Sequence, residues 1–207
     1  MTMIGTNTVT ILFADIKDYS KLYLRQKLEL REVVETELLA AIVDEVGRDS
    51  IKHYNSWGDA YLILFSNVNA GVKAALILRD QFRSRTNWRE LGLPPTLNIR
   101  CSLHVGDVVI KDFENPIFGN KKQDVVGENI DLTARIEPIT PPGRVWATKQ
   151  VIALLPDNTP DGVHVDPIGK LELAKGLPEN NLSKYVAFTH SHIRDKTGTK
   201  TASVDHE

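Results

Sequence analysis

The stretch Thr8-Val-Thr-Ile-Leu-Phe-Ala-Asp15 decides the fold, because this apolar, β-branched run stops abruptly at a carboxylate. It predicts a buried strand whose last residue lies at the rim of a sheet. A second segment, Ile51-Lys-His-Tyr-Asn-Ser-Trp-Gly-Asp59, also ends in an aspartate, at a predicted hairpin turn. Two carboxylates at strand ends supply part of an octahedral shell for Mg²⁺ and leave room for water and phosphate oxygens. Each also has a structural explanation, Asp15 as a helix cap and Asp59 as a turn residue.

Outward from this strand, helices and strands alternate along the chain. We expect helices at 19–47, 69–85 and 127–137, and strands at 8–15, 51–56, 60–66, 96–111, 144–148, 163–173 and 184–188. Asn69 is the predicted N-cap of the second helix, Gly47 the predicted end of the first, and residues 112–122 a predicted excursion from the sheet. The order predicts an α+β fold, a ferredoxin-like βαββαβ core with an additional helix and strands. Its helices would cover one face of a mixed or antiparallel sheet.

The composition favours one domain without a nucleic-acid or membrane partner. We expect the 207 residues to form a domain at 1–189 and a disordered polar tail at 190–207. A formal net charge of −2 offers no excess of Lys and Arg to attract nucleic acid or an anionic membrane. The single Cys101 excludes an internal disulfide and a zinc site with several cysteines. Without a signal-peptide pattern or a long apolar stretch, a soluble cytoplasmic protein is expected.

Four segments occur in a recognisable order: Phe13-Ala-Asp-Ile-Lys-Asp-Tyr-Ser20, Ser56-Trp-Gly-Asp-Ala-Tyr61, Ile99-Arg-Cys-Ser-Leu-His-Val-Gly106 and Asp124-Val-Val-Gly-Glu-Asn-Ile-Asp-Leu-Thr-Ala-Arg135. Together they resemble the signature motifs of class III nucleotidyl cyclases, the family of adenylate and guanylate cyclases. The resemblance spans residues 8–188. It implies an enzyme in which the ribose 3′-oxygen of a nucleoside triphosphate attacks the α-phosphate, giving a 3′,5′-cyclic nucleotide and pyrophosphate.

The same resemblance implies a metal site shared between two subunits. It assigns Asp15, Ile16 and Asp59 to a site for two Mg²⁺ or Mn²⁺ ions, which would activate the 3′-hydroxyl and neutralise the triphosphate. Backbone N–H groups of residues 16–20 would face the β- and γ-phosphates. In this family the metal aspartates come from one subunit, while the base-reading residues and an arginine come from the other. We therefore expect a homodimer with composite active sites at its interface.

Arg135 matches the family's transition-state arginine, although an i,i+4 ion pair with Asp131 would also explain it. Asp131 itself stands where the family has an asparagine that positions the ribose and phosphates. A carboxylate there repels the triphosphate unless it binds ribose hydroxyls, a cation or Arg135. Asn129 cannot replace it, because two residues along a helix point in different directions. Lys175 stands near the position of the family's phosphate-binding lysine, but the sequence does not fix its register. Together with Asp131, this keeps a slow or inactive enzyme as an alternative.

The base specificity depends on Asn55, which stands where adenylate cyclases carry Lys and guanylate cyclases carry Glu. An amide both donates and accepts, so it fits uracil or cytosine better than either purine. The bulky neighbours Tyr54 and Trp57 would narrow the pocket toward a single-ring base, or else belong to the core or the dimer interface. Asp124 aligns with the partner residue that reads adenine, which keeps ATP and CTP open.

These departures resemble the bacterial pyrimidine cyclases of anti-phage defence, which are compact stand-alone domains that make cyclic UMP or cyclic CMP. The sequence thus predicts a cyclase for UTP or CTP, with an adenylate or guanylate cyclase as the alternative. From another class, a non-catalytic domain that binds nucleotide or dimerises as a regulator is the competing interpretation. The retained Asp15 and Asp59 argue against it, since a scaffold has no need of a metal pair.

Overall fold

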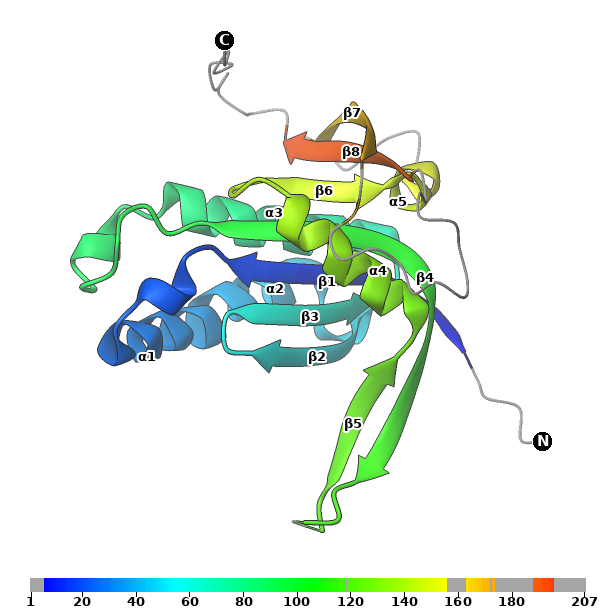
Figure 1. Ribbon diagram of the computed structural model, residues 1–207, viewed down its shortest axis with the longest axis horizontal. Coiled ribbons are helices and arrows are strands. Elements are labelled where there is room, and N and C mark those ends of the chain that lie inside the picture. The colour runs from blue at the N-terminus through cyan, green and yellow to red at the C-terminus, as the bar shows by residue number, and fades with distance from the viewer. Residues whose placement is uncertain (1–5, 118, 156–162, 172, 174–187, 196–207) are drawn as a thin grey trace.

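The computed structural model describes residues 6–117, 119–155, 163–171, 173 and 188–195 (Figure 1). Its strands are β1 (Asn7–Ile16), β2 (Ile51–Trp57), β3 (Ala60–Phe65), β4 (Ile99–Glu114), β5 (Lys121–Val126), β6 (Val145–Thr148), β7 (Val163–Leu171) and β8 (Phe188–Asp195). Its α-helices are α1 (Leu24–Val33), α2 (Leu39–Val46), α3 (Val68–Ser84), α4 (Glu128–Ile136) and α5 (Lys149–Leu154). Single turns of other helix types are η1 (Tyr19–Lys21), η2 (Val34–Leu38), η3 (Arg48–Ser50), η4 (Asn87–Arg89) and η5 (Glu137–Ile139).

One mixed sheet organises the fold, with strand order β2-β3-β1-β4-β6-β8-β7. Only the β4–β6 pair is parallel among the pairings of this path. The four strands β2-β3-β1-β4, with α1 to α3, form the predicted ferredoxin-like core, so the α+β prediction is confirmed. β5 pairs with β4 alone, and the two strands extend from the body as an arm (Figure 1).

The two faces of the sheet bury different cores. The larger core lies between the sheet and α1, α2 and α3, and it contains Leu12, Ala14 and Ile16 of β1. On the other face, which we call the front face, α4 lies across the sheet, and its Ile130 packs against a small core that includes Ile11. Our expectation of helices on one face is thus wrong for α4. Its apolar stripe is narrow, and the sequence does not say which face receives it.

Two helix boundaries differ from the prediction. The first helix does not run from residue 19, because Leu22 after η1 is extended and α1 begins only at Leu24. A π-helical turn at Val34–Leu38 then joins α1 to α2. The helix does end at Gly47, which has a φ of 76°, as predicted. Asn67, not Asn69, caps α3: its backbone is extended, and its side-chain oxygen accepts a hydrogen bond from the Ala70 N–H at 2.9 Å.

The chain between β4 and α4 and the chain end also correct the prediction. β4 continues to Glu114, so only a short turn at 115–120 separates it from β5. The disorder expected from residue 190 is wrong for 190–195, which pair with both β6 and β7 as part of β8. Strand neighbours on both sides order a polar segment that has no apolar periodicity of its own. Residues 196–207 lie outside the described residues, and no helix in the described part is long and apolar enough to span a membrane.

Candidate active site

The strand register places the candidate residues in two rows across the front face. The first row runs Trp57, Ala60, Asp15, Arg100 from β2 to β4, and the second runs Asn55, Leu62, Phe13, Ser102. Residues directly opposite each other in a ladder point to the same side of the sheet. Asp15, Asn55 and Trp57 therefore share the face on which α4 packs. The sequence predicted these residues one by one, and the register brings them together.

The two aspartates lie together at the end of β1. Asp59 occupies the β2–β3 turn, which Gly58 permits with a φ of 72°, and the Asp59 carbonyl accepts a hydrogen bond from the Ile16 N–H at 3.2 Å. Burial raises the pKa of Asp15, and the nearby Asp59 carboxylate raises it further, whereas the hydrogen bond from Arg100 lowers it. A divalent cation would relieve the repulsion between the two carboxylates.

The chemistry of this pair fits magnesium or manganese. In the described part of the chain no three His, Cys, Asp or Glu side chains gather to hold a metal by themselves. Two carboxylates leave most of an octahedral shell to water and to substrate phosphates, as Mg²⁺ prefers. The Ile16 side chain is buried against the helices on the other face, so only its backbone is available to a metal.

Two further residues, Arg100 and Glu137, join the aspartates, and our sequence reasoning missed both. The Arg100 Nη2 donates to the Asp15 carboxylate at 2.5 Å, and its Nε lies 2.8 Å from Glu137 Oε1. That Nε and Oε1 are buried and make no hydrogen bond, so the second contact is an ion pair only. Burial raises the pKa of Glu137 to about 7, helped by the charge of Asp15 and opposed by Arg100. Arg100 could have been found from the register, since it stands directly opposite Asp15.

The predicted phosphate loop is partly occupied by other contacts. The N–H groups of Ile16 and Lys17 donate to the carbonyls of Asp59 and Asn98, at 3.2 and 2.9 Å. Our prediction that these two groups face the phosphates is therefore wrong. Asp18 follows in the left-handed region with a φ of 63°, a strained conformation for a residue that is not glycine. The N–H groups of residues 18–20 keep the predicted role as a proposal.

The residues next to Asn55 lie on two different faces of the sheet. Trp57 is half exposed, and its ring stacks on Phe13 with centroids 6.4 Å apart and planes 20° from parallel. Asn55 is half-buried, and its side-chain oxygen accepts from the Ser56 N–H at 3.0 Å. Tyr54 lies on the opposite face, where its hydroxyl donates to Glu35 at 2.8 Å and burial raises its pKa to about 12. Tyr54 therefore does not join the other candidates.

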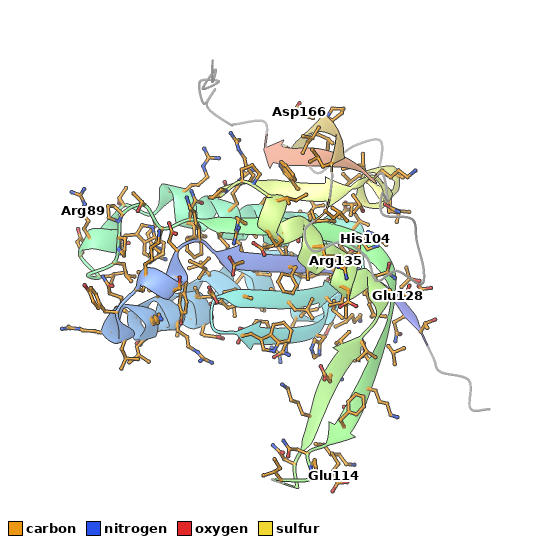
Figure 2. All side chains as sticks on the ribbon, viewed as in Figure 1. Arg89, His104, Glu114, Glu128, Arg135 and Asp166 are labelled. Atoms are coloured by element: carbon orange, nitrogen blue, oxygen red, sulfur yellow. The ribbon has the colours of Figure 1, made fainter. Side chains whose placement is uncertain are left out.

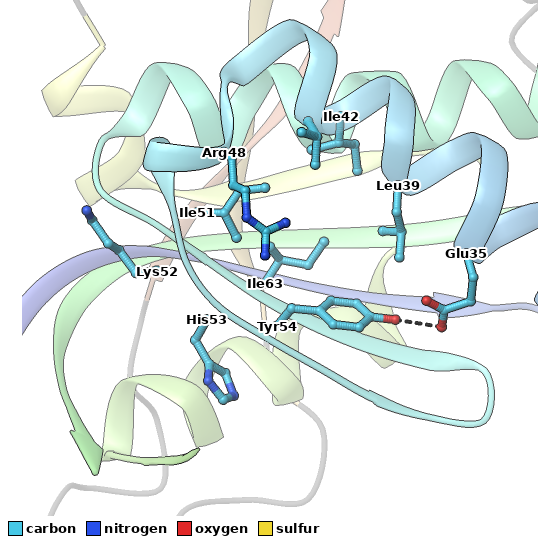
Figure 3. A pocket seen from close by; sticks show the side chains of 10 residues that line it. Glu35, Leu39, Ile42, Arg48, Ile51, Lys52, His53, Tyr54 and Ile63 are labelled. Atoms are coloured by element: carbon cyan, nitrogen blue, oxygen red, sulfur yellow. Dashed lines mark hydrogen bonds between the residues drawn. The ribbon is translucent and has the colours of Figure 1, made fainter. Parts of the chain in front are cut away.

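Tyr54 and Glu35 instead line a pocket of about 370 Å³ between the helices and β2 (Figure 3). Leu39 and Ile42 form part of its apolar wall. Because this pocket lies on the helix-covered side of β2, it is separate from the row that holds Asp15. It is not the candidate active site.

The remaining candidates occupy α4 and the arm. Asp131 is exposed and Arg135 half-buried on α4, in front of the sheet (Figure 2). Asp124 is exposed on β5, opposite Lys111. The arm begins beyond the N-terminal end of β1, so Asp124 lies at the opposite end of the sheet from Asp15. Lys175 lies outside the described residues.

Comparison with known proteins agrees with this geometry. Residues 1–187 match the family "Adenylate and Guanylate cyclase catalytic domain". A putative adenylate cyclase 3 of Rhizobium meliloti is 24% identical over 135 residues, which are 65% of this chain and 21% of that protein. The chain spans only 16% and 21% of the length of two curated relatives that it matches.

Solved structures show the same fold at low sequence identity. The guanylate cyclase domain of RhGC from Catenaria anguillulae, solved with GTP, has a TM-score of 0.71 at 16% identity and covers 92% of this chain and 97% of its own. The adenylyl cyclase CyaB from P. aeruginosa has a TM-score of 0.68 at 16% identity, with 92% and 95% covered. The family match over nearly all of the described residues, together with the aspartate pair at the end of β1, leads to one conclusion: the chain belongs to the adenylate and guanylate cyclase catalytic domain family.

Proposed function

We propose that this domain converts UTP or CTP into the 3′,5′-cyclic monophosphate and pyrophosphate. The observation that carries the proposal is the row of Asp15 and Arg100 at the sheet end, with Asp59 beside it. Carboxylates and a guanidinium group thus lie together at one partly buried position. Phosphoryl transfer needs this more than it needs a covalent catalyst, because charge neutralisation and in-line positioning dominate its barrier.

Asp15 and Asp59, with the backbone of Ile16, would hold the divalent metal ions. Such ions, when bound, neutralise the triphosphate and make the 3′-hydroxyl more acidic. Arg100 lies beside the same carboxylate, so its positive charge would attract a phosphate oxygen that approaches the metal site. Arg135 would stabilise the charge that develops on the α-phosphate, and Asp131 would contact the ribose hydroxyls.

A second copy of the chain would complete the site. Asp124 lies on the arm at the far end of the sheet from Asp15, which agrees with two composite sites in a homodimer. The exposed apolar side chains of Trp57 on the front face and of Phe113 and Ile117 on the arm suit a surface that another subunit covers. The cyclase relatives make this arrangement the natural candidate.

The preference for a pyrimidine rests on Asn55. Its amide stands on the front face, where it would read the base bound at the site whose metal ligands the second subunit supplies. It can pair with the donor and acceptor of uracil or of cytosine. Trp57, stacked on Phe13, offers a flat apolar surface for a base at the same edge. A cyclic pyrimidine nucleotide would act as a second messenger, for which anti-phage defence is the proposed setting; cyclic AMP or cyclic GMP production is the second candidate.

A non-catalytic nucleotide-binding or dimerising regulator is the alternative of another class. Such a scaffold would gain nothing from two neighbouring carboxylates, one of them with a raised pKa. The ion pair of Arg100 and Glu137 beside them is partly buried, and removing its two charges from water costs stability that a scaffold could avoid. These costs favour the enzyme.

The deciding experiment incubates the protein with Mn²⁺ and each of the four nucleoside triphosphates and separates the products by chromatography. Cyclic UMP or cyclic CMP supports the proposal. If cyclic AMP or cyclic GMP is the product and no cyclic pyrimidine nucleotide forms, the base assignment is overturned and the cyclase activity is supported. No cyclic product from any of the four, with a related cyclase active in the same buffer, favours the non-catalytic alternative.

A further inference from the structure

A chain of hydrogen bonds around the buried His104 joins the first turn of α4 to β4 and β6. His104 of β4 is only 3% exposed, and its Nε2 lies 3.0 Å from the Asn129 side-chain oxygen. Its Nδ1 lies 2.9 Å from the hydroxyl of Thr148, which is fully buried. The Asn129 side-chain nitrogen in turn donates to the Asp107 carbonyl at 2.9 Å.

The direction of every bond in this chain is determined. A carbonyl can only accept, so the amide nitrogen of Asn129 faces Asp107 and its oxygen faces the histidine. Nε2 of His104 must then carry the proton, which leaves Nδ1 to accept from the Thr148 hydroxyl. Burial lowers the pKa of His104, which favours this neutral ring. His104 is therefore fixed in one tautomer by groups on β4, α4 and the end of β6.

α4 depends on such polar contacts because its apolar contacts are few. Among its residues only Thr133 and Ile136 are buried, and its N-cap, Gly127, provides no side-chain cap. A second polar contact comes from Ser102, whose hydroxyl lies 2.9 Å from the Thr133 carbonyl. Gly106 makes room for Asn129, since a Cβ there would stand 2.3 Å from the Asn129 Cγ. The backbone of β4 is shaped to receive this amide.

We propose that His104 and Asn129 are positioning residues that set the placement of α4, and with it Arg135 and Asp131, for the cyclisation reaction. The proposal rests on the proposed function for its catalytic consequence, whereas the bonds themselves can be tested without it. His104 is buried beneath α4, so it acts through Asn129 and touches no substrate. Asn129, which was excluded as a replacement for Asp131, here acquires a role of its own on the inner side of the helix.

Two variants of His104 separate positioning from simple structural support. A glutamine places its amide nitrogen near the position of Nε2, so His104→Gln keeps the donor to Asn129 and loses the contact with Thr148. An asparagine reaches only the position of Nδ1, so His104→Asn keeps Thr148 and loses Asn129. Each variant loses one hydrogen bond of His104, but only the second loses the bond to α4. Asn129→Ala is a third variant, and it is less of a risk to folding because Asn129 is partly exposed. Glu128→Ala, on the exposed side of α4, is the control.

We expect His104→Asn and Asn129→Ala to lower kcat about 100-fold with little change in KM, because a small displacement of a catalytic group costs that much. His104→Gln and Glu128→Ala should stay within about threefold of the wild type. The double variant His104→Asn/Asn129→Ala should be no slower than Asn129→Ala alone, since both single variants break the contact between His104 and Asn129. Equal losses in His104→Gln and His104→Asn, or no loss in either, would overturn the proposal.

Two readouts do not depend on activity and so separate this proposal from the proposed function. Nitrogen NMR of the unliganded protein should find His104 neutral with its proton on Nε2. Amide exchange in residues 128–136 should rise about tenfold in His104→Asn and Asn129→Ala but not in His104→Gln. A proton on Nδ1, or unchanged exchange in all three variants, contradicts the inference even if the wild type makes cyclic nucleotide. If the wild type is inactive but shows the neutral Nε2–H tautomer and these exchange rates, the anchoring of α4 is supported and only the proposed reaction is overturned.

Discussion

The two ends of the sheet differ in how firmly their functional residues are held. At one end, β1 lies between β3 and β4, so both edges of the strand that carries Asp15 are paired, and Arg100 and Glu137 close around the carboxylate. At the other end, the arm of β4 and β5 extends from the body, β5 has only one neighbour, and Asp124 faces solvent. In the proposed function the metal ligands Asp15 and Asp59 come from one chain, whereas Asp124 would act on a surface that a second chain has to meet.

The largest expected effect breaks the firm end. Asp59→Ala should lower cyclase activity at least about 1,000-fold, because a metal ligand contributes several kcal/mol of charge stabilisation. Light scattering should give the same oligomeric state as the wild type. The control is Asp44→Ala, which removes an exposed carboxylate from α2 and should leave activity unchanged. A fully active Asp59→Ala would remove this residue from the site.

The second prediction tests whether a second subunit completes the site at the firm end. Asp59→Ala and Arg135→Ala should each be inactive alone. Mixed and allowed to exchange subunits, they should recover about a quarter of wild-type activity, since half of the dimers are mixed and each mixed dimer has one intact site. The measurement is product formation against mixing ratio. Two inactive variants that stay inactive after proven subunit exchange would place all the catalytic groups in one chain.

The third prediction tests whether Asn55 reads the base. Asn55→Lys replaces a donor-and-acceptor by a donor only, so the ratio of kcat/KM for ATP to that for UTP should rise about tenfold or more. Competition assays with both nucleotides measure this ratio directly. Lys52→Asn changes an exposed residue of the same strand and is the control, for which we expect no change in this ratio. An unchanged ratio would mean that Asn55 does not face the base.

The smallest expected effect concerns stability near the firm end. The pKa of Glu137 is about 7 in the folded protein and near 4.5 when unfolded, so the unfolded chain binds fewer protons between these values. The free energy of unfolding should therefore fall as the pH rises from 5 to 7, by about 1–2 kcal/mol. Denaturation of Glu137→Gln should lack this fall. The exposed arm residue Glu114 provides the control, because Glu114→Gln should follow the wild-type curve (Figure 2).

Local sequence patterns predicted much of the fold but little of its assembly. The apolar run before Asp15, the glycine at 47 and the hairpin around Gly58 each carry their own conformational signal, and all three were found where expected. The strand at 188–195 was missed because its order comes from β6 and β7 on either side. The cap at Asn67 was placed two residues late, since both positions carry the same residue type.

The sequence by itself determined that Asp15 and Asp59 each follow a strand and that a helix with Arg135 near its end comes later. Strand ends and helical periodicity are local properties of the chain. Only the tertiary structure decided that Asn55 and Trp57 share a face with Asp15 while Tyr54 does not. It also paired Arg100 with Asp15 and Glu137, and His104 with Asn129. The physical reason is that register and burial depend on residues far apart in the chain, and these set which polar groups must satisfy one another.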